Sequence, residues 1–380
     1  MSRVLVTVLG GLRGGAVLFL LVWGVRGICD APVSGFSHLT FSSQKGAPEG
    51  DKSGFAMGGL DFYYTRAMTE KTSFLFEVVY EFSEETNEAV LDVERAFVKY
   101  EDSNWFKVIA GRTHTSLGYW NDTFHHGSWL QTTIDRPLMY LFEDDGGLLP
   151  VHSVGLEVRG DGKVGPGTMG YALNVANGRG PVADPPQLAS DANNSHAYNL
   201  ALYYEFPQAD LRVGTSYYID HLPDDTDNLT APCYAKGEEV ITTFHLVWQP
   251  AKYELLTEYS QIQHNYAPGS KDANGTTPSR DTVISVGYVQ FAYKTGRWQW
   301  YYRNDFLDAD KHYDSYFANN WDRGLSFDGS GGFPNDKGAD TLGARYDLSD
   351  TTALKAEHSV IGETGAKDLN ISSFNWSYAW

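Results

Sequence analysis

Alternation of apolar and polar residues is the dominant pattern of this chain. From residue 36 onwards, short segments place hydrophobic side chains at every second position, and turn-forming residues separate the segments. A period of two is typical of β-strands, because a helix would scatter the same residues around its circumference. The clearest predicted strands are residues 71–82, 196–206, 238–249, 281–293, 297–308 and 370–380.

Weaker segments of the same kind fill the intervals between these strands. Together they give about sixteen strands, an even number as in closed single-chain bacterial barrels. Many are about ten residues long, which is enough to cross the hydrocarbon core of a bilayer at a tilt. The weaker segments are residues 36–43, 53–65, 89–100, 105–112, 152–160, 168–176, 210–220, 252–262, 339–347 and 352–360.

The links between the predicted strands alternate in length. Short links, such as residues 66–70 and 294–296, alternate with long ones at 113–151, 177–195, 221–237, 263–280 and 309–338. The sequence therefore predicts an all-β fold, a transmembrane antiparallel β-barrel with short periplasmic turns and long extracellular loops. The alternative, a soluble multi-stranded β protein, has no reason to sort its loops in this way.

The first 31 residues have the layout of a secretory signal peptide. Basic residues precede an apolar run from Ala16 to Trp23, which is too short to span a bilayer, and small residues follow at Gly27 and Ala31. We expect cleavage after Gly27 or Ala31, with Ala31 favoured. The barrel then comprises residues 32–380.

Charge and cysteine content narrow the range of functions. The net charge of −19 argues against binding to nucleic acid and is compatible with acidic loops that meet divalent cations and lipopolysaccharide. The only cysteines are Cys29 and Cys233, and the chain has no haem-attachment sequence. No cofactor is expected. The absence of a Gly-x-Ser-x-Gly motif argues against a serine hydrolase, and we expect that the protein is not an enzyme.

The polar face of each predicted strand is expected to face the barrel interior. Sixteen strands enclose a lumen too wide for side chains to fill, so water is expected to occupy it. Charges of both signs are ordinary in a wet channel and costly in a dry core. The predicted lumen-lining residues are Glu77, Lys107, Glu157, Arg159, Arg212, Glu254, Glu258, Arg303, Asp305, Arg345, Lys355 and Glu357.

The C-terminal segment carries a specific signature. One continuous aromatic face resembles the signal by which the barrel-assembly machinery recognises outer-membrane proteins. This face consists of Phe374, Trp376, Tyr378 and Trp380.

Four further segments resemble known porins. Residues 95–100, 110–112 and 117–119 resemble the strand pair and loop start of porins related to the phosphate-selective group, and residues 175–180 are similar to a strand end of these proteins. The resemblance implies a 16-stranded general porin in the outer membrane of a Gram-negative bacterium. Phosphate-selective porins line the pore with arginines and lysines, whereas the predicted lumen here mixes both signs. A general or mildly cation-preferring pore is therefore the favoured interpretation.

The long link at residues 113–151 is the main candidate for a functional loop. Its aromatic and aliphatic content argues against disorder, and we expect it to fold inward and to form the pore constriction. Arg136 facing Glu143, Asp144 or Asp145 would produce a transverse field there. The alternative is a lid over the mouth or a contact between subunits.

Four histidines in or beside this link are candidate metal ligands, because imidazole suits zinc and copper. Their spacing matches no compact motif, and adjacent histidines rarely bind one ion. Hydrogen-bonding roles are therefore favoured, and no metal site is predicted. The four are His114, His125, His126 and His152. Similarly, Asp308, Asp310 and Asp314 are expected to lie in a solvated acidic loop rather than a calcium site.

Two functions are compatible with these features. The first is a passive diffusion channel for small hydrophilic solutes or ions, for which a homotrimer is plausible. The second is a porin-like sheath around a multihaem cytochrome, through which electrons cross the outer membrane.

Overall fold

The computed structural model of the protein describes residues 33–47, 50–82, 89–125, 127–141, 148–180, 195–222, 237–269, 281–309, 314–318, 336–363 and 367–380. The predicted signal peptide, residues 1–31, lies outside these residues and stays a prediction.

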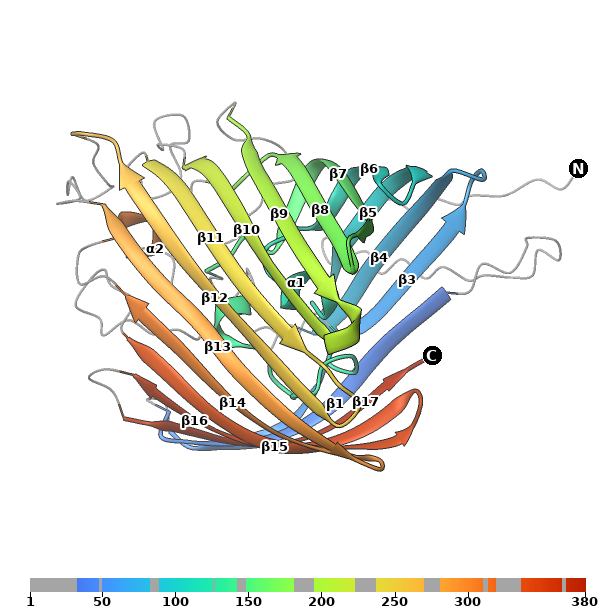
Figure 1. Cartoon of the computed structure of the whole chain (residues 1–380). Coiled ribbons are helices and arrows are strands. Elements are labelled where there is room, and N and C mark those ends of the chain that lie inside the picture. The colour runs from blue at the N-terminus through green and yellow to red at the C-terminus, as the bar shows by residue number, and fades with distance from the viewer. Residues whose placement is uncertain are drawn as a thin grey trace, which may run out of the picture. The chain divides into compact units, whose positions relative to one another are not determined.

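Antiparallel strands follow one another around a closed sheet (Figure 1). From β3 onwards each strand pairs with the next strand along the chain, and the last strand pairs with the first. The strands are β1 (Val33–Lys45), β2 (Lys52–Met57), β3 (Leu60–Ala67), β4 (Thr72–Phe82), β5 (Ala89–Ser103), β6 (Phe106–His114), β7 (His152–Val164), β8 (Gly167–Ala176), β9 (Ala197–Phe206), β10 (Leu211–Leu222), β11 (Gly237–Trp248), β12 (Tyr253–Tyr266), β13 (Thr282–Thr295), β14 (Trp298–Ala309), β15 (Lys337–Ser349), β16 (Thr352–Glu363) and β17 (Leu369–Ala379).

Two of these strands form a single pass across the barrel. β2 and β3 both pair with β1, and only Gly58 and Gly59 separate them. The amide of Gly58 donates a hydrogen bond to the carbonyl of His38 on β1 (2.9 Å), which keeps the interrupted strand attached. The described residues thus form a closed barrel of sixteen strands, and the predicted fold is confirmed. The predicted segment 53–65 spans the two strands β2 and β3, and each other predicted segment coincides with one strand, with ends that differ by a few residues.

The links between strands are sorted as the sequence predicts. One end of the barrel carries tight turns, for example between β13 and β14, where Gly296 adopts a positive φ of 58°. The strand ends that flank the longer links, β6–β7, β8–β9, β10–β11, β12–β13 and β14–β15, lie at the opposite end.

The two faces of the sheet differ in chemistry. On β17, the aromatic side chains of Phe374 and Trp376 are each 49% exposed on the outer surface. Asn375 and Ser377 alternate with them and are fully buried on the inner face. This alternation continues around the barrel and leaves an apolar exterior, as expected for a surface that contacts lipid.

Helices are few and short in the described part of the chain. They are α1 (Trp120–Thr123) and α2 (Ser315–Ala318), together with the 3-10 turns η1 (Leu138–Tyr140) and η2 (Pro207–Ala209). No described helix has the length and hydrophobicity needed to cross a bilayer.

The barrel interior is less polar than the strand pattern predicts. Inward-facing apolar residues of β10 to β14, such as Ile241, Ile262 and Val286, form one buried cluster with residues of the β6–β7 link. The link contributes Leu117, Trp120, Met139, Tyr140, Leu148 and Leu149 to this cluster. The prediction of a uniformly wet lumen is wrong in this region, because the link supplies an apolar surface against which these wall residues pack.

Candidate functional site

The β6–β7 link turns into the barrel, and hydrogen bonds join its two ends. The amide of Thr115 donates a hydrogen bond to the carbonyl of Val151 (2.9 Å), which joins the two ends of the link. The side-chain amide of Asn121 donates to both Thr115 O (2.8 Å) and Val151 O (2.9 Å). The segment between these ends, which includes α1 and η1, is called the inner loop below.

A single carboxylate on β12 holds the first part of the inner loop. Glu258 accepts hydrogen bonds from the amides of Tyr119 (2.6 Å) and Trp120 (2.8 Å). It also accepts bonds from the hydroxyls of Tyr140 (2.9 Å) and Tyr288 (2.8 Å). Burial and the nearby Glu258 carboxylate raise the pKa of Tyr140 well above its usual value, so its hydroxyl remains a donor. Glu258 is 2% exposed, so these donors replace its water shell.

Two further acidic residues hold the second part of the inner loop. Glu357 on β16 accepts a hydrogen bond from the amide of Ile134 (2.8 Å), and Asp305 on β14 accepts one from the amide of Leu138 (3.0 Å). The backbone N–H groups of a loop need partners when they leave water. Inward carboxylates supply these partners here.

Cations of the same wall bind carbonyls of the inner loop. The ammonium of Lys355 donates to the carbonyls of Ser128, Gln131 (2.9 Å) and Thr133 (2.7 Å). Arg303 donates to Asp135 O (2.8 Å) and Arg136 O (3.0 Å), and Arg345 to Trp129 O (2.7 Å) and Gln131 O (2.8 Å). These predicted lumen residues therefore contact the loop rather than open water.

The other predicted lumen residues lie around the rest of the wall. Glu254 on β12 accepts a hydrogen bond from the hydroxyl of Thr132 (2.7 Å), while Glu77 on β4 pairs with Arg95 on β5. Glu157 and Arg159, both on β7, form an ion pair (2.9 Å).

A cavity of about 180 Å³ remains between α1 and the wall formed by β6 to β11. Its charged lining consists of Lys107, Arg159 and Arg212 from the wall, with Asp161 from β7 and Asp122 from α1. Arg159 pairs with Asp122 across the cavity (3.0 Å), and Lys107 pairs with Asp161 (3.0 Å). The guanidinium of Arg212 stacks on the ring of Tyr203, 3.7 Å from its centroid. Cations of the wall thus face an acidic residue of the inner loop.

The predicted constriction residues are only partly described. Arg136 is half-buried, and its guanidinium lies 5.8 Å from the centroid of the Trp120 ring. Glu143, Asp144 and Asp145 lie outside the described residues. The opposition of Arg136 to these acids therefore stays a prediction.

Three of the four candidate histidines come together. His114, His125 and His152 lie around Glu94 of β5, and the fourth, His126, lies outside the described residues. Glu94 is not among the residues predicted from the sequence. The feature that could have identified Glu94 is its position on the inward face of β5, near the end of the barrel where His114 of β6 and His152 of β7 lie.

The burial of the segment around α2 inside the barrel was also not predicted from the sequence. α2 follows Asp314, which is buried and accepts hydrogen bonds from the imidazole of His264 (2.8 Å) and the hydroxyl of Tyr266 (2.7 Å). Burial alone would raise the pKa of Asp314, but the His264 imidazole and the hydrogen bonds from His264, Thr282 and Tyr266 lower this pKa to about 2. Asp314 therefore anchors α2 to β12, and the prediction that it lies in a solvated acidic loop is wrong.

Replacement of Gly118 by alanine is expected to dislodge the start of the inner loop. Gly118 has a φ of 74°, and a Cβ there would overlap with the Tyr140 hydroxyl and the Glu258 carboxylate. We expect faster hydrogen exchange of residues 115–125, by at least tenfold, because strain and overlap together cost about 2 kcal/mol or more. Gly296→Ala is the matched control, since Gly296 has a φ of 58° but no neighbour within 4 Å of its Cβ position. Equal exchange in the two variants would contradict the close approach of Gly118 to Glu258.

No protein-family model and no curated protein matches the chain. Solved structures do match over nearly its whole length. The outer membrane channel DcaP of Acinetobacter baumannii matches with a TM-score of 0.60 and 12% identity, covering 92% of this chain and 96% of that one. A loop L8 deletion mutant of OmpT, an outer membrane protein of Vibrio cholerae, gives 0.58 and 12%, covering 92% and 100%.

Two other structures extend this comparison. OmpF of Salmonella typhi in complex with daunomycin gives a TM-score of 0.55 and 10% identity, covering 92% of this chain and 97% of that one. OmpT also matches in a trimer form, with a TM-score of 0.53 and 11% identity, covering 92% and 100%. At these identities, the comparisons establish the fold, which this chain shares with outer-membrane barrels.

Proposed function

We propose that this barrel is a porin of the bacterial outer membrane, a water-filled channel through which small hydrophilic solutes or ions diffuse passively. The closed sixteen-stranded barrel with an apolar exterior supports a place in the membrane, since each strand's backbone groups find partners within the sheet. The shared fold with DcaP and OmpF supports a channel of this kind. No cofactor is needed for this activity.

The inner loop is the observation that carries this proposal. Its hydrogen bonds to Glu258, Asp305 and Glu357 hold it against the wall formed by β12 to β16. It reduces the cross-section of the barrel on that side and leaves the charged cavity on the other side. Steric exclusion beside the loop and the field of the cavity charges would then select solutes.

The purified protein alone tests the proposal in planar bilayers. We expect stepwise currents that scale linearly with small applied voltages, without any added partner. Folded protein that inserts into the bilayer but passes no current would contradict a diffusion channel.

The net charge of the chain predicts a mild preference for cations. The positively charged residues that line the cavity oppose this preference. Arg212→Gln removes a positive charge from the cavity wall, so we expect the reversal potential in a salt gradient to shift towards that of a more cation-selective pore. The size expected is about a twofold change in the cation-to-anion permeability ratio. Lys45→Gln, on the exposed end of β1, is the control and should leave the ratio unchanged. A shift of Arg212→Gln towards anions would contradict this placement of the pathway.

The cytochrome sheath is the less favoured function. A multihaem protein inside the barrel would have to displace the inner loop, which packs the fully buried side chains of Leu117, Met139 and Tyr140 against the wall. The channel needs no such rearrangement.

The remaining partners follow from the proposed location. We infer that the acidic outer loops bind lipopolysaccharide through divalent cations. We also infer that the barrel-assembly machinery recognises the aromatic face of β17. A homotrimer is proposed because OmpT of the same fold occurs in a trimer form.

A further inference from the structure

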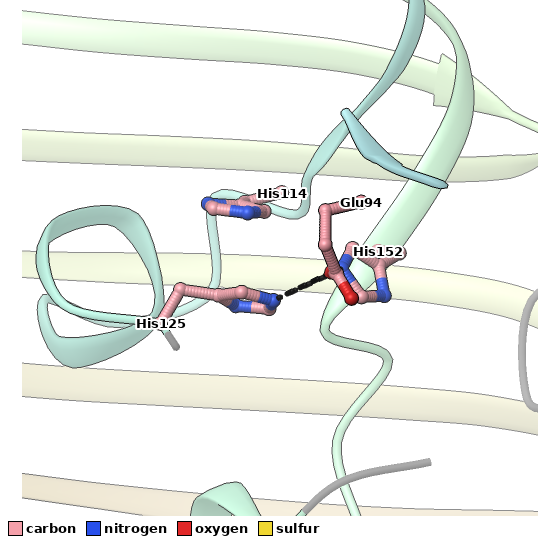
Figure 2. Close-up of side chains that lie close together, drawn as sticks. All are labelled: Glu94, His114, His125 and His152. Atoms are coloured by element: carbon pink, nitrogen blue, oxygen red, sulfur yellow. Dashed lines mark hydrogen bonds and ion pairs between the residues drawn. The ribbon is translucent and has the colours of Figure 1, made fainter. Parts of the chain in front are cut away.

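One cluster of side chains lies apart from the cavity and joins the inner loop to the opposite wall. Glu94, His114 and His152 come from the neighbouring strands β5, β6 and β7, whereas His125 lies two residues after the end of α1. Figure 2 shows His125 directed at the Glu94 carboxylate, His152 beside that carboxylate and the ring of His114 lying over that of His125. One ligand atom of each lies within 4.8 Å of those of the other three.

The distances within this cluster are short. The Nε2 atom of His152 lies 2.7 Å from Oε2 of Glu94 and 2.9 Å from Nε2 of His125. The Nε2 atom of His125 lies 3.4 Å from the same carboxylate oxygen. The ring of His114 is stacked on that of His125, with centroids 3.7 Å apart. Glu94, His125 and His152 are each 3% exposed or less, so little water reaches these atoms.

Asn121 fixes the orientation and the tautomer of His125. Both hydrogens of its amide nitrogen are directed at carbonyls, those of Thr115 and Val151, which can only accept. Its Oδ1 atom must therefore accept a hydrogen bond from Nδ1 of His125 (2.8 Å), which places a proton on Nδ1. In the neutral ring this leaves the lone pair on Nε2, which points into the cluster. Metal-ligating histidines are typically oriented by a hydrogen bond of this kind at the other ring nitrogen.

The chemistry of the donors indicates the class of ion. Imidazole and carboxylate ligands suit zinc and related transition metals, whereas calcium and magnesium take oxygen ligands. In a tetrahedral zinc site with bonds of about 2.0–2.1 Å, ligand atoms are about 3.3–3.4 Å apart. The observed separations of 2.7 to 3.4 Å among three of the donors need only a small expansion. The stacked His114 would reach the ion by rotation of its ring.

We propose that Glu94, His114, His125 and His152 form a binding site for a Zn²⁺-class transition metal ion. The ion would join the inner loop, through His125, to three strands of the barrel wall. This inference does not depend on the proposed transport function, because it concerns only the affinity for metal and the attachment of the loop.

Metal analysis of folded, detergent-solubilised protein without a histidine tag tests the proposal. Because the cluster is buried, Zn²⁺ is supplied both to the folded protein and during refolding, and excess metal is then removed by gel filtration. We expect about one Zn²⁺ per chain after refolding with metal. His125→Gln/His152→Gln is expected to lose at least nine-tenths of it, and His114→Gln to weaken binding by about 10–100-fold. His358→Gln, an exposed histidine on β16, is the control and should bind as the unaltered chain does.

Three measurements decide the outcome. If the refolded wild-type chain retains no more metal than the folded double variant, the site does not exist. If the double variant fails to fold, X-ray absorption of the zinc-loaded wild-type chain replaces the comparison: at least two imidazole ligands are expected, and a shell of oxygen atoms alone overturns the proposal. Zn²⁺ should also slow hydrogen exchange of residues 115–125 in the wild-type chain, and unchanged exchange would overturn the attachment of the loop.

Discussion

Replacing residues 120–145 by a short Gly–Ser linker is expected to raise the single-channel conductance several-fold. The inner loop carries Trp120, Met139 and Tyr140 into the barrel, where they pack against the walls of β10 to β14. Their removal leaves an aqueous passage through sixteen strands, and barrels of this size enclose an open channel when nothing fills them. The conductance of single channels in planar bilayers at fixed salt concentration measures the effect.

Folding of the deletion variant must be established separately. The shift in electrophoretic mobility on heating distinguishes folded from unfolded barrel, and only a variant with the folded mobility is informative. A folded deletion variant with unaltered conductance would show that the inner loop does not limit the flow of ions.

Substitution of Glu258 by glutamine is expected to release the loop intermittently. The carboxylate accepts bonds from two backbone amides and two hydroxyls, and a glutamine would direct a donor group at some of these donors. Hydrogen bonds to charged groups contribute about 1.5–3 kcal/mol each, so the loss of two weakens docking by about 3 kcal/mol or more. This free energy corresponds to about a hundredfold change in the docking equilibrium. Frequent transitions to a larger conductance level should appear in single-channel records.

Glu101→Gln is the matched control for this experiment. It removes the same charge from the exposed end of β5, where Glu101 pairs with Lys99 (2.8 Å) and is 37% exposed. Surface ion pairs contribute little, so its records should match those of the unaltered chain. If Glu258→Gln shows no additional conductance level, Glu258 is not the anchor of the loop.

The barrel was predictable from the sequence because period-two alternation is a local signal. In β17, Phe374 and Trp376 alternate with Asn375, and no knowledge of distant residues is needed to assign the two faces. The sorting of short and long links is equally visible along the chain. These two features determine the number of strands and the direction of each.

The interior was predictable only in part, because it depends on contacts between residues far apart in the chain. Alternation places Glu258, Lys355 and Glu357 inside, but it does not distinguish a side chain in water from one bonded to a loop. The backbone amides that donate to Glu258 are 138 and 139 residues away. Glu94 likewise meets His125 and His152 only after three strands have paired and the loop has turned inward.

The pairing of β1 with β17 has a consequence for the biogenesis of the protein. Ten residues of β1, from Phe36 to Lys45, are matched with Asn370 to Ala379. Contacts with so large a sequence separation form slowly, because the two ends of a long chain segment must first be brought together at a cost in entropy. The edge of the first strand therefore stays unsatisfied until the ribosome has completed the last one. A polypeptide in this state is prone to aggregate, so we expect its export to depend on chaperones that keep it unfolded up to the moment of insertion.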